Sequence, residues 1–382
     1  MLIEISKTGF VNKGAELMLH AIVQQLAEHV PEVDVAVAPG GLRASSFQKR
    51  ARLGLYQKAW LWKTGVNWGG LAGLLPPLAR QMYGIVLDRE VDVVLDAAGF
   101  SYSDQWGGDT VHELARSARR WRQRGTRVIL LPQAFGPFGT AKIRRELKDA
   151  IDNIDLVFAR DETSYAHLVN AVGEQPKIRI APDFTNLLAG IPPVNDWMKE
   201  KICVVPNSRM IDKTDGDTAS GYAPFLARCI RLIEERGRGS FLLVHEGEGD
   251  FKLAKRISEL AGGVEIVREH DPLRIKGILG ASFASVGSRF HGLVSAMSQG
   301  VPTLGTGWSH KYAELFGDYG AADLLVDVSG SEERLAAALD RITNEQARVE
   351  LVSVLQARSE VLKAKSAQMW SEVFTLIAQN GA

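Results

Sequence analysis

Short apolar runs alternate with longer amphipathic stretches along most of this chain. In the first half, such runs occupy residues 2–6, 33–38, 91–96, 127–132 and 156–159, and several are continuous in Val, Ile and Leu. Runs of this kind are typical of strands that are buried on both faces of a parallel sheet. In the second half, similar runs occupy 202–206, 241–245, 264–267 and 283–287, with a weaker one at 324–328. The alternation predicts βαβ units and an α/β fold of two doubly wound, Rossmann-like domains.

The segment 189–195, Ala-Gly-Ile-Pro-Pro-Val-Asn, interrupts any regular element and is predicted to be the linker. We expect an N-terminal domain over residues 1–190 and a C-terminal domain over 198–345. A last helix within 346–382 is expected to pack back toward the N-terminal domain. Two domains are the default for 382 residues, and ligands of such folds usually bind in the cleft between the halves.

Residues 51–85 depart from this rhythm and are interpreted as a helical insertion. They mix aromatic with basic residues: Tyr56, Trp60, Trp62, Trp68 and Tyr83 with Lys58, Lys63 and Arg80. Two interpretations remain open. Apolar stripes on helices are mostly packing, which favours a helix with its Trp side chains in the core. Alternatively, a basic, Trp-rich segment can make a peripheral contact with a membrane or stack on sugar rings.

Composition and charge exclude some classes of protein. The 45 basic residues balance 45 acidic ones, so nothing in the net charge indicates nucleic-acid binding. Cys203 and Cys229 have neither metal-binding nor redox spacing and fit a reducing compartment. No signal-peptide pattern opens the chain, and no run approaches the ~20 apolar residues that span a bilayer. We expect a cytoplasmic protein, peripheral at most to the inner face of a membrane, and no metal site.

The segment 287–302 carries the strongest chemical signal. It places Arg289, His291 and Gly292 between a predicted strand and a predicted helix, where free N–H groups and the helix dipole favour an anion. The guanidinium suits a carboxylate or phosphate, and the imidazole can carry a proton near neutral pH. The simpler interpretation is an Arg paired with a nearby carboxylate and a His that caps the helix.

Other loops that follow predicted strands also carry polar groups near the edge of a sheet where ligands usually bind. Ordinary loop structure explains several of them equally well. Asp161 can cap a helix while it pairs with Arg160, and the acidic turn at 246–250 is interpreted as a solvated loop. The candidate residues are Asn12, Gly14, Glu16, Asp104, Gln133, Arg160, His310 and Lys311.

The stretch Ser288-Arg289-Phe290-His291-Gly292, with Gly300-Val301-Pro302 and Lys311, resembles the C-terminal hallmark of the polysaccharide pyruvyl transferase family. Weaker pieces occur in the family's order over roughly residues 5–320: Asn12 to Glu16, Gly99 with Asp104, Gln133 with Gly136-Pro137, Arg160 to Ser164, and Pro182-Asp183.

The resemblance implies a fold similar to GT-B glycosyltransferases and transfer of the pyruvyl group of phosphoenolpyruvate to a sugar. The product is a ketal on a polysaccharide or its precursor, phosphate is released, and no nucleotide cofactor takes part. Phosphoenolpyruvate needs two or three cations for its carboxylate and phosphate, and its methylene carbon must be protonated by a positioned acid. The expected donor-binding residues are Arg289, Arg160, Ser288, Lys311 and His310.

We expect His291 to transfer the proton, with anchoring of the donor phosphate as the alternative for this residue. Asp161 or Asp183 is the other candidate acid. Asn12, Gly14, Glu16, Asp104 and Gln133 are expected on the acceptor side, and so is the insertion at 51–85. The sequence leaves open which sugar is the acceptor and whether it is lipid-linked.

Two other functions remain open. The first is a GT-B-like nucleotide-sugar glycosyltransferase or epimerase, for which Glu314 would hold a ribose. The second is a non-catalytic carbohydrate-binding relative of these enzymes.

Overall fold

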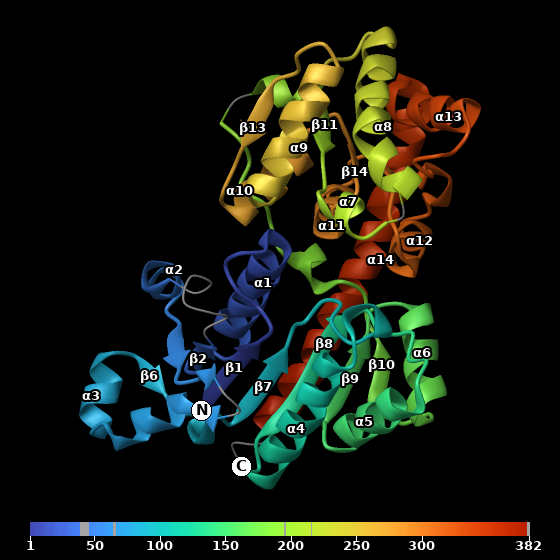
Figure 1. Ribbon diagram of the computed structural model, residues 1–382. Coiled ribbons are helices and arrows are strands. Elements are labelled where there is room, and N and C mark those ends of the chain that lie inside the picture. The colour runs from blue at the N-terminus through green and yellow to red at the C-terminus, as the bar shows by residue number, and fades with distance from the viewer. Residues whose placement is uncertain (39–45, 64–65, 195, 215, 380–382) are drawn as a thin grey trace. The chain divides into compact units, whose positions relative to one another are not determined.

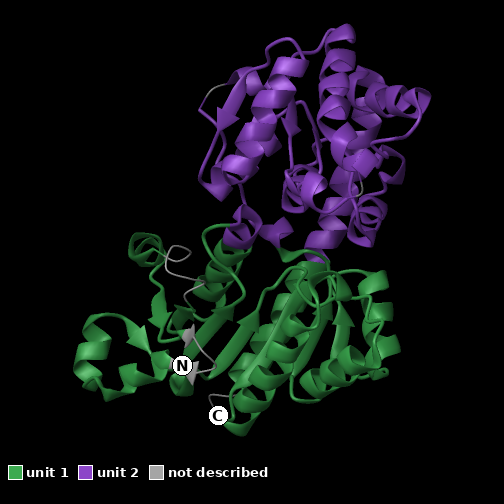
Figure 2. Cartoon of the chain, viewed as in Figure 1, with its two compact units in different colours: residues 1–11, 18–184, 365–382 green, residues 12–17, 185–364 purple. Residues whose placement is uncertain are grey.

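The computed structural model describes residues 1–38, 46–63, 66–194, 196–214 and 216–379 (Figure 1). The chain divides into two compact units (Figure 2). Unit 1 comprises residues 1–11, 18–184 and 365–382, and unit 2 comprises 12–17 and 185–364. Each unit contains a parallel sheet with helices, so the predicted α/β fold class is confirmed.

Unit 1 is built on an eight-stranded parallel sheet in the order β10-β9-β8-β7-β1-β2-β3-β6. The central strand β1 pairs with β2 on one side and with β7 on the other. The order reverses between β1 and β7, and ligands of open α/β sheets bind outside the carboxyl ends of strands at such a point. The strands are β1 (Leu2–Ser6), β2 (Asp34–Val37), β3 (Tyr56–Lys58), β6 (Ile85–Val86), β7 (Val93–Asp96), β8 (Arg127–Gln133), β9 (Leu156–Ala159) and β10 (Ile178–Ile180).

The helices of unit 1 bury apolar faces against this sheet. Trp121 on α4 and Leu147 on α5 belong to one buried cluster with Val94 and Val128 of the strands, which is the expected core of a layered α/β domain. The helices are α1 (Lys13–His29), whose first turn is counted in unit 2, α2 (Phe47–Arg52), α3 (Pro77–Met82), α4 (Asp109–Gln123), α5 (Ala141–Asp152) and α6 (Glu162–Val172).

Unit 2 is built on a five-stranded parallel sheet in the order β13-β12-β11-β14-β15. Its order reverses between β11 and β14, so the carboxyl end of β14 lies at the point where ligands usually bind. The strands are β11 (Ile202–Val205), β12 (Ser240–Val244), β13 (Ile266–Arg268), β14 (Ala284–Gly287) and β15 (Thr303–Gly305).

The helices of unit 2 are α7 (Arg209–Asp212), α8 (Gly216–Glu235), α9 (Gly247–Leu260), α10 (Pro272–Ala281), α11 (Phe290–Met297), α12 (His310–Asp318), α13 (Glu332–Thr343) and α14 (Glu345–Ala378). The last helix continues beyond unit 2, and its residues from Lys365 onward are counted in unit 1. There Trp370 is buried in an edge contact with Phe184, and Phe374 stacks on His29.

The units meet along the chain at Phe184 and Thr185, a few residues before the expected linker. The boundary lies before the expected linker because the segment after Thr185 is anchored within unit 2. The backbone of Gly190 approaches Gly277 so closely that a side chain on Gly190 would collide with it, and Lys276 donates to the Thr185 carbonyl over 2.9 Å.

Two expectations about secondary structure are wrong. Residues 324–328 form no strand and contribute only an isolated bridge between Leu325 and Gly305. The insertion at 51–85 is not one core-packed helix. Its described part consists of the end of α2, the short strands β3 and β6, the strand pair β4 (Trp62–Lys63) and β5 (Val66–Asn67), a 3₁₀ segment η1 (Trp68–Leu74), and α3. Neither η1 nor α3 buries a side chain, so the core interpretation fails for Trp68.

Candidate functional site

The loops at the carboxyl ends of β12, β11 and β14 form a polar cluster in unit 2. His245 and Glu246 follow β12, Asn207 follows β11, and Arg289 follows β14. These three strands are neighbours in the sheet, so their carboxyl ends bring together residues that lie far apart in the sequence.

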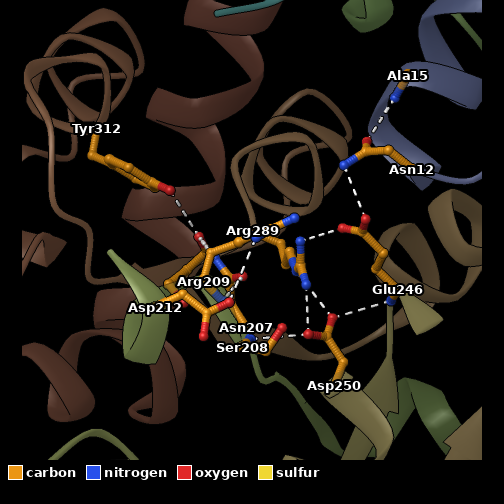
Figure 3. Close-up of polar contacts among 11 residues, drawn as sticks. Asn12, Ala15, Asn207, Ser208, Arg209, Asp212, Glu246, Asp250, Arg289 and Tyr312 are labelled. Atoms are coloured by element: carbon orange, nitrogen blue, oxygen red, sulfur yellow. Dashed lines mark hydrogen bonds and ion pairs between the residues drawn. The ribbon is translucent and has the colours of Figure 1, made fainter. Parts of the chain in front are cut away.

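Arg289 is buried and ion-paired with two carboxylates of α9 and the residue before it (Figure 3). Its Nε donates to Asp250 Oδ2 over 3.0 Å, its Nη2 bonds Asp250 Oδ1, and its Nη1 bonds Glu246 Oε2. The interpretation of Arg289 as an Arg paired with nearby carboxylates is therefore confirmed. Donor binding by Arg289 stays a prediction.

The expectation of a solvated acidic loop at 246–250 is wrong for Asp250, which has no exposed surface. The carboxylate turns inward because it receives backbone N–H groups as well as the guanidinium. Ser208 N donates to it over 2.9 Å and Glu246 N over 3.1 Å (Figure 3). A carboxylate held by several N–H groups is a fixed anchor, and Asp250 thereby sets the orientation of Arg289.

The first turn of α1 belongs to the same cluster. Asn12 donates from Nδ2 to Glu246 Oε1 over 3.1 Å, and its Oδ1 accepts from Ala15 N over 2.9 Å (Figure 3). Lys13 and Glu16, both buried, form an ion pair of 2.6 Å. The structure thus places Asn12, Gly14 and Glu16, expected on the acceptor side, in unit 2 with Arg289 and His291.

His291 lies against Gly14. A Cβ on residue 14 would collide with Nδ1 of the imidazole and come within 3.0 Å of its Cγ and Cε1. Only glycine permits this approach, so the turn that begins α1 defines one side of the space that the His291 ring occupies.

We expect Gly14→Ala to destabilise unit 2 by about 1–3 kcal/mol, because the added methyl must displace His291 or the first turn of α1. Thermal unfolding of the full chain measures this. Gly317→Ala on α12 is the matched control, since a Cβ there meets nothing within 4 Å. Equal melting temperatures for the two variants would contradict the close packing of Gly14 on His291.

His245 is a further member of the cluster that the sequence did not reveal. Burial lowers the pKa of this imidazole well below its usual value, and the charges of Arg289, His291 and Lys13 lower it further. Its Nδ1 is buried, without a hydrogen-bond partner among the described residues. His245 is consequently neutral at physiological pH, with one ring nitrogen as donor and the other as acceptor.

Ser288 stabilises the loop that carries Arg289. Its buried hydroxyl lies 2.6 Å from the hydroxyl of Tyr222. Its carbonyl accepts from Asn207 Nδ2 over 2.8 Å and from the Tyr312 hydroxyl over 3.0 Å. These contacts fix the backbone that carries Arg289, and a direct donor contact by Ser288 stays a prediction.

His310 and Lys311 begin α12, and both are half-buried. Lys311 Nζ lies 5.4 Å from the ring centroid of Phe290 and 5.3 Å from those of Trp308 and Tyr312. Aromatic faces attract a cation at this range. The ammonium is thereby held next to Phe290, the residue between Arg289 and His291.

Unit 1 carries the other predicted site residues. Asp161 caps α6 by accepting from Ser164 N over 2.7 Å, which confirms the capping interpretation. Arg160 is buried and pairs with Asp183, Nη1 to Oδ2 over 3.5 Å. Asp104 accepts from Gly139 N through Oδ2 and so ties two loops together.

Gln133 lies in a buried polar group of unit 1 with Asp96 and Tyr102. Its Nε2 donates to Asp96 Oδ1 over 3.3 Å, and the Tyr102 hydroxyl donates to Asp96 Oδ2 over 2.9 Å. Burial raises the pKa of Asp96. Contact of Gln133 and Asp104 with the acceptor stays a prediction.

A pocket of about 200 Å³ opens beside this polar group in unit 1. It is lined at the carboxyl ends of β1, β3 and β7 by residues that include Lys7, Lys58, Trp60 and Asp96. Lys58 is buried and pairs with Glu4 over 2.6 Å and with Asp88 over 2.8 Å. Within the described part of the chain, no group of three His, Cys, Asp or Glu side chains is arranged to hold a metal ion.

Two parallel α/β sheets, with polar loops at the carboxyl ends of the strands, give the chain a GT-B-like fold. The fold is similar to that of HepE from Anabaena in complex with UDP and glucose, at 13% identity over 99% of this chain and 100% of that chain, with a TM-score of 0.60. It is also similar to the UDP-GlcNAc 2-epimerase from Neisseria meningitidis bound to UDP-GlcNAc, at 11% identity over 96% and 100%, with a TM-score of 0.57. At such identities the similarity shows the fold alone.

The family model of polysaccharide pyruvyl transferase matches residues 12–310. This chain therefore belongs to the polysaccharide pyruvyl transferase family. The matched range begins at Asn12 and ends at His310, so it contains the whole polar cluster of unit 2. A search of curated proteins gave no match.

Proposed function

We propose that the protein transfers the pyruvyl group of phosphoenolpyruvate to a sugar of a polysaccharide or its precursor. The reaction forms a pyruvate ketal and releases phosphate. The observation that carries this proposal is that the family match includes one cluster in which Arg289, His291, His245 and Lys13 lie together. Both cations are ion-paired in the free protein, Arg289 with Asp250 and Glu246 and Lys13 with Glu16, so a highly anionic donor would take the place of a carboxylate.

Arg289 has to serve the donor while it is paired with carboxylates. Three of its five N–H donors are used by Asp250 and Glu246. Asp250 is fixed by two backbone N–H groups, whereas the Glu246 side chain bonds only Arg289 and Asn12 among the described residues. We infer that the donor's carboxylate or phosphate takes the remaining donors of Arg289 and displaces Glu246, while Asp250 keeps the guanidinium in place.

The proton balance of the reaction suits His291. Two sugar hydroxyls add to the central carbon of phosphoenolpyruvate, the C–O bond to phosphate breaks, and the methylene carbon becomes a methyl group. One hydroxyl proton ends on that methyl carbon and the other on the released phosphate. A group that both accepts and donates a proton is therefore sufficient, and imidazole does so near neutral pH.

Several donor contacts remain part of the proposal. Lys311 and His310 begin the helix beside Phe290 and would add positive charge, Ser288 shapes the loop, and Arg160 is the candidate from unit 1. For the acceptor, we propose the pocket of about 200 Å³ in unit 1. Its size suits a single sugar ring rather than a drug-sized ligand, whose pockets are about 300–1,000 Å³.

Binding of phosphoenolpyruvate is expected to raise the melting temperature of the protein, because a ligand of the native state stabilises it by mass action. UDP-glucose is expected to have no effect. Incubation with phosphoenolpyruvate and a panel of glycosides, some lipid-linked, should release phosphate and increase the mass of one acceptor by a pyruvyl group. Stabilisation by UDP-glucose and not by phosphoenolpyruvate would instead favour a nucleotide-sugar enzyme, and stabilisation by glycosides alone would favour a non-catalytic carbohydrate-binding protein.

A further inference from the structure

One short region of unit 1 exposes an unusual number of large apolar side chains. Within 68–83, seven such side chains are exposed, and we call them the 68–83 surface: Trp68, Leu71, Leu74, Leu75, Leu78, Met82 and Tyr83. Leu74 is 83% exposed, Met82 74% and Leu78 69%. Elsewhere in the described chain, exposed large apolar residues are scattered singly or in pairs, which is normal for a protein surface.

The core of unit 1 does not account for these residues. Neither η1 nor α3, which together carry most of them, buries any side chain. In Figure 1, α3 and β6 lie at one edge of unit 1, beyond β2, and β6 is the last strand of the sheet. An apolar sequence at a sheet edge whose large side chains stay exposed in the described part of the chain indicates a partner outside the chain.

The charge pattern of the surrounding sequence selects the kind of partner. From Val35 to Leu87 the chain has no acidic residue, although it has seven basic ones: Arg43, Lys49, Arg50, Arg52, Lys58, Lys63 and Arg80. The next acidic residues, Asp88 and Glu90, are paired with Lys58 and Arg80. Lys58 and Arg50 are buried, so the positive charge that reaches the surface comes from residues such as Lys49 and Arg52. This asymmetry is local, because acidic and basic residues balance over the whole chain.

Apolar and aromatic side chains among basic residues match the interface of an anionic lipid bilayer, where rings and aliphatic chains enter the headgroup region and cations meet lipid phosphates. A second copy of the chain fits less well. A two-fold contact between two 68–83 surfaces would place one basic segment against another, and like-charge juxtaposition is unfavourable.

No helix of the described residues is both long and apolar enough to cross a membrane. We propose that the 68–83 surface docks the protein on the surface of an anionic membrane, without crossing it. This proposal goes beyond the proposed function and does not depend on it.

Vesicle flotation tests the proposal on the full chain. The protein is expected to float with vesicles of phosphatidylglycerol and phosphatidylcholine, and much less with phosphatidylcholine alone or at high salt. The triple variant Leu74→Ser, Leu78→Ser, Met82→Ser should reduce the partition coefficient at least about tenfold, which corresponds to about 1.4 kcal/mol. Its fold should be intact, since α3 and η1 bury no side chain, and circular dichroism checks this.

A second triple variant, Val349→Ser, Val354→Ser, Val361→Ser, is the matched control. These valines are 66%, 42% and 52% exposed on α14, and their replacement should leave vesicle binding unchanged. Absence of wild-type binding, or an equal loss in both variants, would overturn the proposal. A third outcome would also overturn it: the wild-type protein self-associates and does not bind vesicles, and the first triple variant no longer self-associates. A second copy of the chain would then be the partner.

Discussion

Asp250→Ala is expected to lower the free energy of unfolding by about 3–5 kcal/mol, the usual cost of leaving a buried charge without its partner. Asp250 has no exposed surface, and it holds Arg289 through both carboxylate oxygens. Its removal also leaves the N–H groups of Ser208 and Glu246 without their acceptor. Urea denaturation of the full chain, followed by circular dichroism, measures the effect.

Asp212→Ala is the control for this experiment. Asp212 pairs with Arg209 at 3.5 Å, but both side chains are more than half exposed. Exposed pairs contribute only about 0–1 kcal/mol, so this variant should unfold close to wild type. If the two variants unfolded at the same urea concentration, Asp250 would not be the anchor that its contacts indicate.

His291→Ala is expected to reduce ketal formation by about 10²–10⁴-fold, the usual contribution of a positioned acid or base. His291→Gln separates its two proposed roles. If His291 transfers the proton, this variant should bind phosphoenolpyruvate normally in calorimetry and release phosphate slowly. If His291 anchors the donor phosphate, affinity should fall together with the rate.

His270→Ala is the control for the His291 variants, because His270 is an exposed histidine of the same unit. It should keep wild-type turnover and affinity. Near-wild-type turnover of His291→Ala would remove this residue from the mechanism and weaken the proposed pyruvyl transfer.

The strands of both units could be predicted from sequence because continuous Val, Ile and Leu runs mark strands that are buried on both faces. β1 and β9 have the predicted bounds, Leu2–Ser6 and Leu156–Ala159. The 51–85 region could not be predicted in the same way. Its apolar residues lie at an exposed edge, and composition alone does not distinguish an exposed apolar segment from a buried one.

Within the candidate site, residue types and turn positions were predictable, but pairings were not. Arg289 and Asp250 are 39 positions apart, and only the neighbouring strands β12, β11 and β14 bring them together. His245 could not be singled out because it ends an apolar run and was assigned to the predicted strand.

The Arg289–Asp250 pair also changes how Arg289 should be tested. Arg289→Ala would leave the buried Asp250 carboxylate without its partner and so perturb folding along with binding. Arg289→Lys is the better variant, since it keeps the positive charge and loses the bidentate geometry of the guanidinium.

Neither unit is a single continuous piece of the sequence, and this has a consequence for synthesis on the ribosome. Unit 2 needs residues 12–17, which are made long before the rest of that unit, and unit 1 needs 365–382, which are made after the rest of unit 2. Trp370, which is buried against Phe184, emerges long after the sheet of unit 1 has been translated. Multidomain chains generally fold domain by domain as they are made. Here Phe184 and His29 lack their partners on the last helix until residues 365–382 have been made, after the whole of unit 2, so Phe184 offers chaperones an apolar target during elongation.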